Sequence, residues 1–263
     1  MTKLFQRYLN LLGIPREKPS LDALSRVVHA QMTTVPFENV SKLYYLRTEG
    51  RRDVPDFERF LDGIEHFHFG GTCYACAAYL HRLLVELGYD VDLCGADMQN
   101  PDVHLVNIVR IDRREFLVDA GYGAPFLTPL PRDLSADYTI EMGADRYVLS
   151  PMDETRRSRL TQYNDTILRH EYTVNPRPRQ FNEFAKVVAD SFRPDATFMN
   201  ALLIVRFGDN LSRVLRNRSY TELNGSIVRV RNLDSVEEIV AVIEQRFGIP
   251  AEIARIALDG LPL

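Results

Sequence analysis

The feature that most constrains the fold of this chain is a change in hydrophobic periodicity near residue 90. Before it, apolar residues recur at spacings of three and four, as in residues 4–12, which is typical of amphipathic helices. After it, short segments alternate apolar and polar residues and are separated by polar turns, which indicates strands. The pattern therefore predicts an α+β chain in which helices come first and an antiparallel β region follows.

The helices of the first 88 residues have recognisable ends. Gly13 ends the first helix, Ser20 is a candidate N-cap for the second, and a third can begin at Pro55. Residues 35–39 are expected to be irregular, because a proline at position 36 disfavours the helical conformation in the residue before it. A fourth helix ends before Gly88.

Six strands are expected in the middle of the chain, and their regular spacing suggests a small barrel or sandwich. They lie near residues 91–97, 104–111, 115–119, 138–142, 146–150 and 166–174. Further on, the pattern predicts a helix near 180–190, strands over 199–207 and 212–230, and a helix beginning at Asp234. We therefore expect three parts: a helical bundle (1–88), an antiparallel β domain (89–175) and a mixed α/β part (176–263).

Composition excludes several classes of protein. The 263 residues carry 32 basic and 36 acidic side chains, so nothing suggests a nucleic-acid surface. No apolar run approaches the roughly 18 residues of a membrane span, and the N-terminus lacks the apolar core of a signal peptide. Three cysteines are too few for a disulfide framework. We expect a soluble, cytoplasmic protein that binds neither nucleic acid nor membrane.

The sharpest chemical signal is Cys73, which follows Gly70 and Gly71 at the start of a predicted helix. The free N–H groups and the dipole of a helix N-terminus favour a thiolate, the reactive form of cysteine. A thiolate nucleophile needs a base, and the base needs a group that orients it. His104 begins one predicted strand and Asp119 ends the next, so a hairpin between them places both at the same open end.

Other interpretations of these residues remain open. Cys73 can be a small buried apolar residue beside a turn, and His66 and His68 are alternative bases because they lie close to it in sequence. A Cys-x-x-Cys pair can also indicate a redox motif or half of a zinc site. The zinc hypothesis would use Cys73, Cys76, Cys94 and His104, whose spacing matches no common arrangement.

At these residues the chain resembles the arylamine N-acetyltransferase family, and the resemblance covers nearly the whole chain. It is carried by residues 35–39 (Val-Pro-Phe-Glu-Asn), 70–73 (Gly-Gly-Thr-Cys), 87–91, 104–106 and 117–123 (Leu-Val-Asp-Ala-Gly-Tyr-Gly). It implies a helical bundle, a central antiparallel β-barrel and a C-terminal α/β lid around a cysteine-protease-like Cys-His-Asp core. By this likeness Cys73 is the nucleophile, His104 its base and Asp119 the orienting residue.

The resemblance also implies substrates. It implies acetyl-CoA, or another acyl-CoA, as co-substrate without a permanently bound cofactor or metal. The acyl group would pass through a cysteine thioester to an arylamine, hydrazine or N-hydroxyarylamine. Phe37, Tyr122 and Phe126 match positions in and beside the acceptor pocket of the family, with core packing as their other interpretation.

Near Cys73 the chain departs from the family pattern. Phe69, Ala75 and Ala77 stand where the family has Arg, Glu or Gln, and Asn, and the Ser/Thr-rich stretch of the lid is thinned in residues 187–198. Two alternative functions follow. One is an acyltransferase that forms amides or esters on a biosynthetic or carrier-bound intermediate. The other is a non-catalytic binding module that retains the fold.

Overall fold

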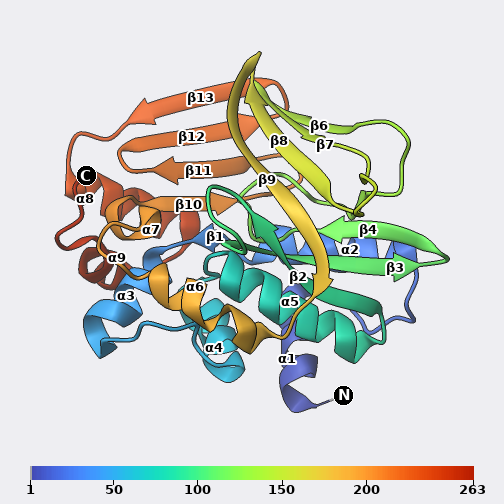
Figure 1. The fold of residues 1–263 in the computed structure, drawn as a ribbon. Coiled ribbons are helices and arrows are strands. Elements are labelled where there is room, and N and C mark those ends of the chain that lie inside the picture. The colour runs from blue at the N-terminus through green and yellow to red at the C-terminus, as the bar shows by residue number, and fades with distance from the viewer. Residues whose placement is uncertain (1) are drawn as a thin grey trace.

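The computed structural model, which describes residues 2–263, places the N-terminal helices below two antiparallel sheets (Figure 1). These helices are α1 (Lys3–Leu12), α2 (Leu21–Thr34), α3 (Val40–Glu49), α4 (Phe57–Phe67) and α5 (Cys73–Leu87). Their predicted ends are largely confirmed: Gly13 adopts φ 69° after α1, and the Ser20 hydroxyl accepts the N–H of Ala23. The helix α4 begins at Phe57 rather than at Pro55, and its N-cap is Asp56, whose carboxylate accepts the N–H of Arg59.

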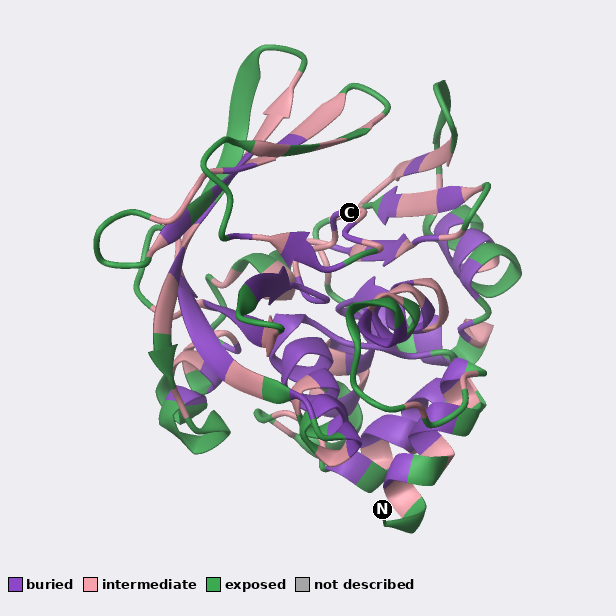
Figure 2. Ribbon diagram, turned by 90° about the vertical axis from the view of Figure 1, so that its right-hand side faces the viewer, coloured by how far each residue is buried: buried purple, intermediate pink, exposed green. Residues whose placement is uncertain are grey.

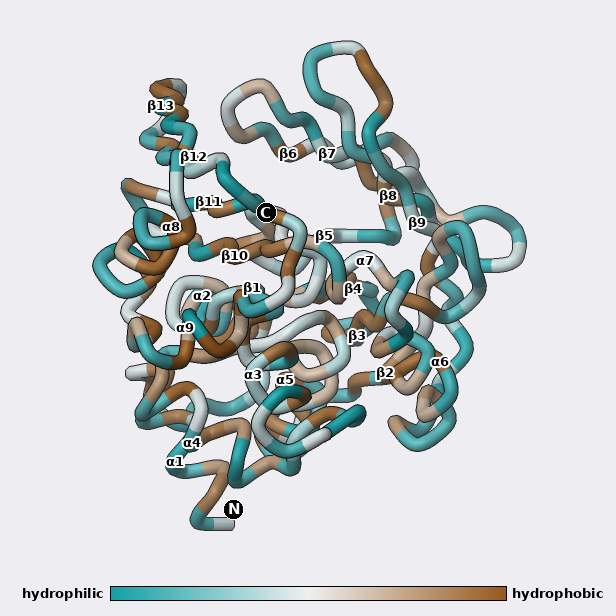
Figure 3. The backbone as a smooth tube through the Cα atoms, turned by 90° about the vertical axis from the view of Figure 1, so that its left-hand side faces the viewer, coloured by the Kyte–Doolittle hydropathy of each residue, from teal (hydrophilic) through white to brown (hydrophobic). Residues whose placement is uncertain are grey.

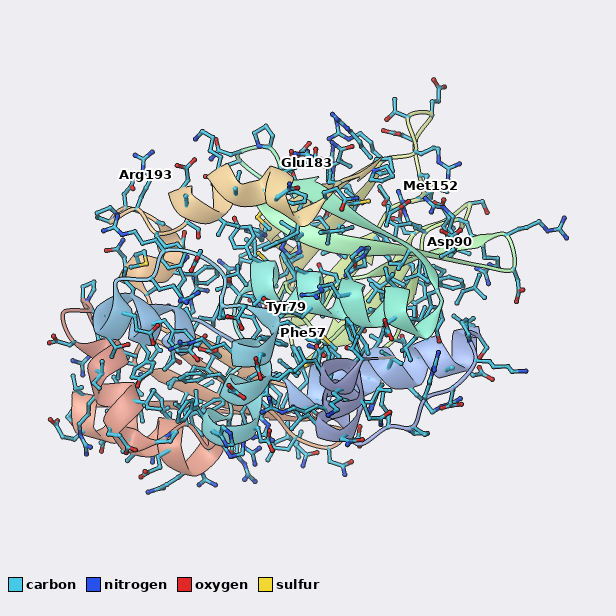
Figure 4. All side chains as sticks on the ribbon, turned by 90° about the horizontal axis from the view of Figure 1, so that it is seen from below. Phe57, Tyr79, Asp90, Met152, Glu183 and Arg193 are labelled. Atoms are coloured by element: carbon cyan, nitrogen blue, oxygen red, sulfur yellow. The ribbon has the colours of Figure 1, made fainter. Side chains whose placement is uncertain are left out.

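The bundle is held together by aromatic rings between α4 and α5. Phe57 and Tyr79 lie side by side at the centre of the bundle (Figure 4), with ring centroids 5.2 Å apart. Phe60 stacks on the same tyrosine at 4.5 Å. Most of α5 is buried because helices cover one side of it and the larger sheet covers the other. A helix enclosed in this way holds its first residue in a fixed position.

The larger sheet has the order β5-β4-β3-β2-β9-β8-β7-β6, with antiparallel neighbours throughout. Its strands are β2 (Asp90–Asp97), β3 (His104–Ile111), β4 (Arg114–Val118), β5 (Leu130–Pro131), β6 (Tyr138–Met142), β7 (Asp145–Leu149), β8 (Ser158–Asn164) and β9 (Ile167–Pro178). The long strand β9 arches between β8 and β2, so the sheet curves towards a barrel (Figure 1). Figure 2 shows buried residues at its centre and exposed residues at the hairpin tips.

The smaller sheet combines a strand from the first part of the chain with strands from the last part. Its strands, in order, are β1 (Phe37–Glu38), β10 (Leu203–Arg206), β11 (Ser212–Arg216), β12 (Ser219–Asn224) and β13 (Ile227–Asn232). The helical segments α8 (Val236–Val242), η2 (Ile243–Phe247) and α9 (Ala251–Leu258) supply apolar side chains to the same core as this sheet and α3. Hydrophobic stretches along β2 and β10 are visible in Figure 3.

The structure corrects three predictions of local structure. Residues 35–39, expected to be irregular, contain β1, because the extended conformation that a proline favours in its predecessor also suits a strand. The cap of the helix expected at Asp234 is Ser235, whose hydroxyl accepts the N–H of Glu238. The helix expected near 180–190 begins as a 3₁₀ turn (Phe181–Phe184) that leads into α6 (Ala185–Asp190).

Several elements were absent from the prediction, namely α3, β5, β8, α7 (Thr197–Asn200) and α9. The α+β fold class is confirmed, whereas the boundaries of the three domains remain a prediction. Strand β1, from the first part, pairs with β10, from the last part. None of the helices in residues 2–263 combines the length and apolar composition of a membrane span.

Candidate active site

Two glycines bring the chain into α5 at a sharp turn. A Cβ at position 70 would lie 1.8 Å from the carbonyl oxygen of Pro36, so only glycine fits there. Gly71 has φ +134°, and a Cβ on it would lie 2.9 Å from that of Ala75. The turn is tied to β1, because the N–H of Glu38 donates to the carbonyl of Gly71 at 3.1 Å. Cys73 is therefore the first residue of α5, as predicted.

The hairpin of β3 and β4 brings His104 and Asp119 together. Asn107 pairs with Val118, which places Asp119 just beyond the paired residues, within two residues of His104 across the hairpin. The Nε2 atom of His104 lies 2.9 Å from Oδ2 of Asp119, and each of the two residues is 2% exposed. The expected proximity of the two residues is confirmed.

The remaining partners of the Asp119 carboxylate keep it in one orientation. The Tyr172 hydroxyl donates to Oδ2 at 2.6 Å, and the N–H of Gly121 donates to Oδ1 at 2.9 Å. Gly121 also lies against the nucleophile turn, since a Cβ on it would be 2.5 Å from the Cα of Cys73. The Asp119 loop and the start of α5 are therefore in direct contact.

Tyr172 is a site residue that sequence reasoning missed. It lies on β9, 53 positions from Asp119, and only the pairing of β9 with β2 and β8 brings it to the carboxylate. The one available signal was its alternation with Val174, which points both side chains to the barrel interior.

His104 carries a strongly shifted pKa. Burial lowers it, but the charge and hydrogen bond of Asp119, together with a hydrogen bond to Cys73, raise the pKa of His104 to about 10. Since Nε2 faces Asp119, Nδ1 is the ring atom left for the Cys73 thiol. An imidazolium beside a thiol favours the thiolate form of the cysteine.

The other cysteines lie in different surroundings. Cys76 is enclosed in the helical core, where its thiol contacts the Gly71 carbonyl at 3.4 Å and burial raises its pKa. Cys94 lies inside the barrel, and burial raises its pKa to about 12. All three thiols are free, and within residues 2–263 no three His, Cys, Asp or Glu side chains form a group that could hold a metal ion.

The two competing histidines are also placed apart from Cys73. His66 contacts the ring of Phe67 on α4, and His68 caps the C-terminal end of that helix with φ 53°. A Cβ at Gly248 would lie 2.8 Å from the His68 ring, so this histidine packs against the C-terminal part of the chain. The structure therefore brings Cys73 together with His104, and not with His66 or His68.

Cys73 opens onto a cleft of about 700 Å³. One wall comes from α5 and the loop after β2, and the other comes from β9 and the α6–α7 segment. Residues that line it include Cys73, Tyr74, Val103, His170, Val187, Arg193 and Phe198. Arg193 projects beyond the end of α6 (Figure 4). A cleft of this size accommodates a small organic substrate.

The three predicted substrate residues do not line this cleft themselves; Phe37 and Tyr122 lie behind residues that do. Phe37 is buried, and its ring contacts that of Phe198, which lines the cleft, at a centroid distance of 5.6 Å. Tyr122 is half-buried and its ring lies 5.8 Å from that of His104. Phe126 is 1% exposed and stacks beneath Tyr122 at 6.0 Å. Their role in acceptor binding remains a prediction.

The departure at Phe69 is accommodated by two local changes. The Phe69 ring is buried among aromatic side chains, including Tyr44 at 6.0 Å and Tyr45 at 5.8 Å between centroids. Glu38, also fully buried, accepts the backbone N–H groups of Ser41 at 2.8 Å and Gly70 at 3.0 Å. A buried carboxylate without a nearby cation needs hydrogen-bond donors, and these two backbone N–H groups supply them where no arginine occupies position 69.

Lys42 is a second cationic side chain near the thiol. Its Nζ donates to the carbonyl and the hydroxyl of Ser191, both at 2.7 Å, and lies 4.0 Å from the centroid of the Phe192 ring. Burial lowers the pKa of Lys42 to about 8, and the charge of Cys73 acts in the opposite direction. Lys42 therefore connects α3 to the α6 region beside the cleft.

Comparison with known proteins identifies the family. A family model described as N-acetyltransferase matches residues 20–256. The chain is 26% identical over 262 residues to Proansamycin X synthase of Amycolatopsis mediterranei (91% of this chain, 95% of that protein). It is also 26% identical over 268 residues to an arylamine N-acetyltransferase of Mycolicibacterium smegmatis (92% and 90%).

The fold agrees with these matches. The structure of Mycobacterium marinum arylamine N-acetyltransferase in complex with CoA superposes with a TM-score of 0.81 at 21% identity, covering 98% of this chain and 100% of that one. The family model covers most of the chain, including Cys73, His104 and Asp119. The chain belongs to the arylamine N-acetyltransferase family, whose members are enzymes that transfer acetyl groups.

Proposed function

We propose that this protein transfers an acyl group from acyl-CoA, through a thioester on Cys73, to an arylamine, hydrazine or N-hydroxyarylamine. One observation carries the proposal. The Cys73 thiol lies at the wall of a cleft and is hydrogen-bonded to the buried His104 imidazole, which in turn contacts the Asp119 carboxylate. This is the geometry that nucleophilic catalysis requires of a nucleophile, its base and the group that orients the base.

In the first half-reaction the Cys73 thiolate attacks the carbonyl carbon of the acyl-CoA thioester. The carbon–sulfur bond to CoA breaks, CoA leaves as a thiolate that takes up a proton, and Cys73 retains the acyl group as a thioester. One thioester replaces another of similar energy, so the free energy of the loading reaction is close to zero. The imidazolium of His104 stabilises the attacking thiolate, and Asp119 keeps the ring in position.

Backbone N–H groups at the start of α5 suit the oxyanion of the tetrahedral intermediate. Thr72 is the N-cap of this helix and its side chain makes no capping hydrogen bond. The first N–H groups of a helix have no partner within the helix and point at its N-terminus, where Cys73 lies. Hydrogen bonds aimed at a developing negative charge are among the largest contributions to catalysis.

The acyl-CoA donor is supported by the M. marinum relative, whose structure is described as a complex with CoA. The aromatic acceptor is supported by Tyr122 and by Phe37, which reaches the cleft through Phe198. Flat aromatic rings beside a cleft suit a planar amine, because offset and edge-to-face ring contacts are favourable.

A second candidate function is the formation of an amide or ester on a biosynthetic or carrier-bound intermediate. Two observations favour it. A relative of nearly equal length is named a synthase of Proansamycin X. In addition, Phe69, Ala75 and Ala77 remove polar side chains next to the nucleophile turn. This alternative uses the same thioester chemistry with a different donor and acceptor.

Intact-protein mass spectrometry after incubation with acetyl-CoA, propionyl-CoA and malonyl-CoA tests the donor. We expect one acyl adduct, absent in Cys73→Ala and retained in Cys76→Ala, since Cys76 is enclosed in the core. Iodoacetamide should likewise label Cys73 first near neutral pH, and more slowly in His104→Ala. Loading by a carrier-bound acyl group but by no acyl-CoA would favour the second candidate. Labelling of Cys76 instead of Cys73 would contradict both.

A further inference from the structure

One wall of the Cys73 cleft is a segment that depends on other parts of the molecule for its position. Residues 185–200 contain only the short helices α6 and α7, of six and four residues. Helices of this length are not stable by themselves, so contacts with the rest of the molecule fix where the segment lies. Val188 and Phe192 of this segment pack in the same apolar cluster as Cys73, so the position of the wall shapes the surroundings of the thiol.

Two polar side chains from the start of α3 hold this wall. Asn39, the N-cap residue of α3, is fully buried, and its Nδ2 atom donates to the carbonyl oxygen of Phe198 at 2.9 Å. Lys42, in the first turn of α3, donates from Nζ to the carbonyl and hydroxyl oxygens of Ser191, both at 2.7 Å. Most of the residues between these two anchors line the cleft. The same helical turn therefore holds the cleft wall at two places.

The Lys42 anchor depends on a positive charge. The ammonium lies 4.0 Å from the centroid of the Phe192 ring, where a cation is attracted to the face of the ring. The Ser191 hydroxyl that accepts from Lys42 donates in turn to the carbonyl of Val188 at 2.6 Å, so the contact continues into α6. The pKa of Lys42, which burial lowers to about 8, leaves the ammonium largely charged at neutral pH.

Packing behind the wall is incomplete, and this increases the importance of the Lys42 contacts. A cavity of about 40 Å³ lies next to the lysine. Its lining includes Gly71 and Thr72 of the nucleophile turn, together with Val188 and Phe192 of the wall. An empty space supplies no van der Waals contacts to hold a neighbouring segment in place. Loss of the Lys42 ammonium would therefore let the wall move.

We propose that Lys42 is a positioning residue for the acyl-CoA donor, because it fixes the cleft wall against which this large substrate binds. The inference rests on the proposed function and deepens it by naming a residue that sets donor binding. An acyl-CoA is much larger than p-nitrophenyl acetate, so its binding depends on the walls of the cleft, whereas the small ester needs only access to Cys73. A displaced wall should therefore weaken binding of the first donor and leave the reaction with the second unchanged.

The variant Lys42→Met tests this, because it keeps the length of the side chain and removes the ammonium. Rapid mixing followed by intact-protein mass spectrometry measures loading of Cys73 at increasing concentrations of acetyl-CoA. We expect the half-saturating concentration to rise about tenfold and the maximal rate to stay within about threefold, the pattern of lost ground-state binding. Loading by p-nitrophenyl acetate should stay within about twofold, which also shows that the variant is folded.

The matched control is Arg47→Met on the same helix. Arg47 donates to the carbonyl of Ala257 and so connects α3 to α9 instead of to the cleft wall. We expect this variant to leave loading by both donors unchanged.

A double-mutant cycle tests whether Lys42 acts through Ser191, whose hydroxyl Ser191→Ala removes. If the two residues act as a unit, Ser191→Ala should weaken acetyl-CoA binding less in the Lys42→Met background than in the unsubstituted protein. Fully additive effects would overturn the inference.

Two further outcomes would overturn the inference and leave the proposed function intact. One is an unchanged half-saturating concentration of acetyl-CoA in Lys42→Met. The other is equal slowing with both donors, since this would assign Lys42 a direct effect on the thiol. If no acyl-CoA loaded the unsubstituted protein, the proposed donor would be wrong, and the inference with it.

Discussion

Two buried carboxylates lie near the start of α5, and their surroundings differ. Asp119 follows β4 and contacts an imidazole, a phenol and a backbone N–H. Glu38 is in β1 and accepts hydrogen bonds from two backbone N–H groups. Asp119 thus controls the charge of His104, whereas Glu38 holds the Gly70 turn. The comparison shows that the partners of a buried carboxylate, and not its burial, decide whether it acts on chemistry or on structure.

The largest expected effect comes from neutralising the carboxylate that contacts the imidazole. Asp119→Asn preserves shape but removes the charge that keeps His104 protonated and orients its ring. In the proposed acyl transfer we expect kcat/KM to fall by about 10³–10⁴-fold, the order found when a triad aspartate becomes asparagine. Steady-state kinetics, with Cys73 alkylation as a second measurement, checks this. Activity within tenfold of the unsubstituted protein would remove the distinction between the two carboxylates.

Glu38→Gln is the matched change at the other carboxylate, and we expect the opposite result. A glutamine side chain offers one acceptor oxygen, so one of the N–H groups of Ser41 and Gly70 loses its partner. Urea denaturation should show a loss of about 1–2 kcal/mol in the free energy of unfolding, because an unpaired buried donor is costly while a buried charge is removed. We expect kcat/KM to stay within tenfold. A loss as large as that of Asp119→Asn would instead assign Glu38 to the chemistry.

A third expected effect is a change in how stability depends on pH. The pKa of His104 is raised to about 10, so its contribution is fully present below about 6.5, the pKa of an unfolded histidine. That contribution is lost as pH rises towards 10. The free energy of unfolding should therefore fall over this range, and the fall should be smaller in Asp119→Asn.

Glu38 again provides the contrast. Asp119 and Cys73, and not Glu38, are the groups that raise the pKa of His104, so Glu38→Gln leaves the contribution of His104 in place. In Glu38→Gln the fall between pH 6.5 and 10 should match that of the unsubstituted protein. Equal slopes in all three proteins, measured by urea denaturation, would contradict the assigned role of Asp119.

Much of the fold could be predicted because its signals are local. Glycine at a left-handed position, a serine that caps a helix and the alternation of apolar residues in a strand each depend on a few consecutive residues. The helix α9 was missed because it is short and follows directly on Gly248 and Pro250, which signal the end of the preceding helix. Strand β8 was missed because its polar residues interrupt the expected alternation.

The sequence by itself determined the nucleophile turn and the proximity of His104 to Asp119, because a glycine turn and a hairpin are short-range structures. Tertiary structure decided that Tyr172 reaches the Asp119 carboxylate. It also decided that backbone N–H groups satisfy Glu38 in the absence of an arginine. These contacts depend on the curvature of the larger sheet and on the pairing of β1 with β10. They join segments far apart in the chain, where no local pattern specifies which side chains meet.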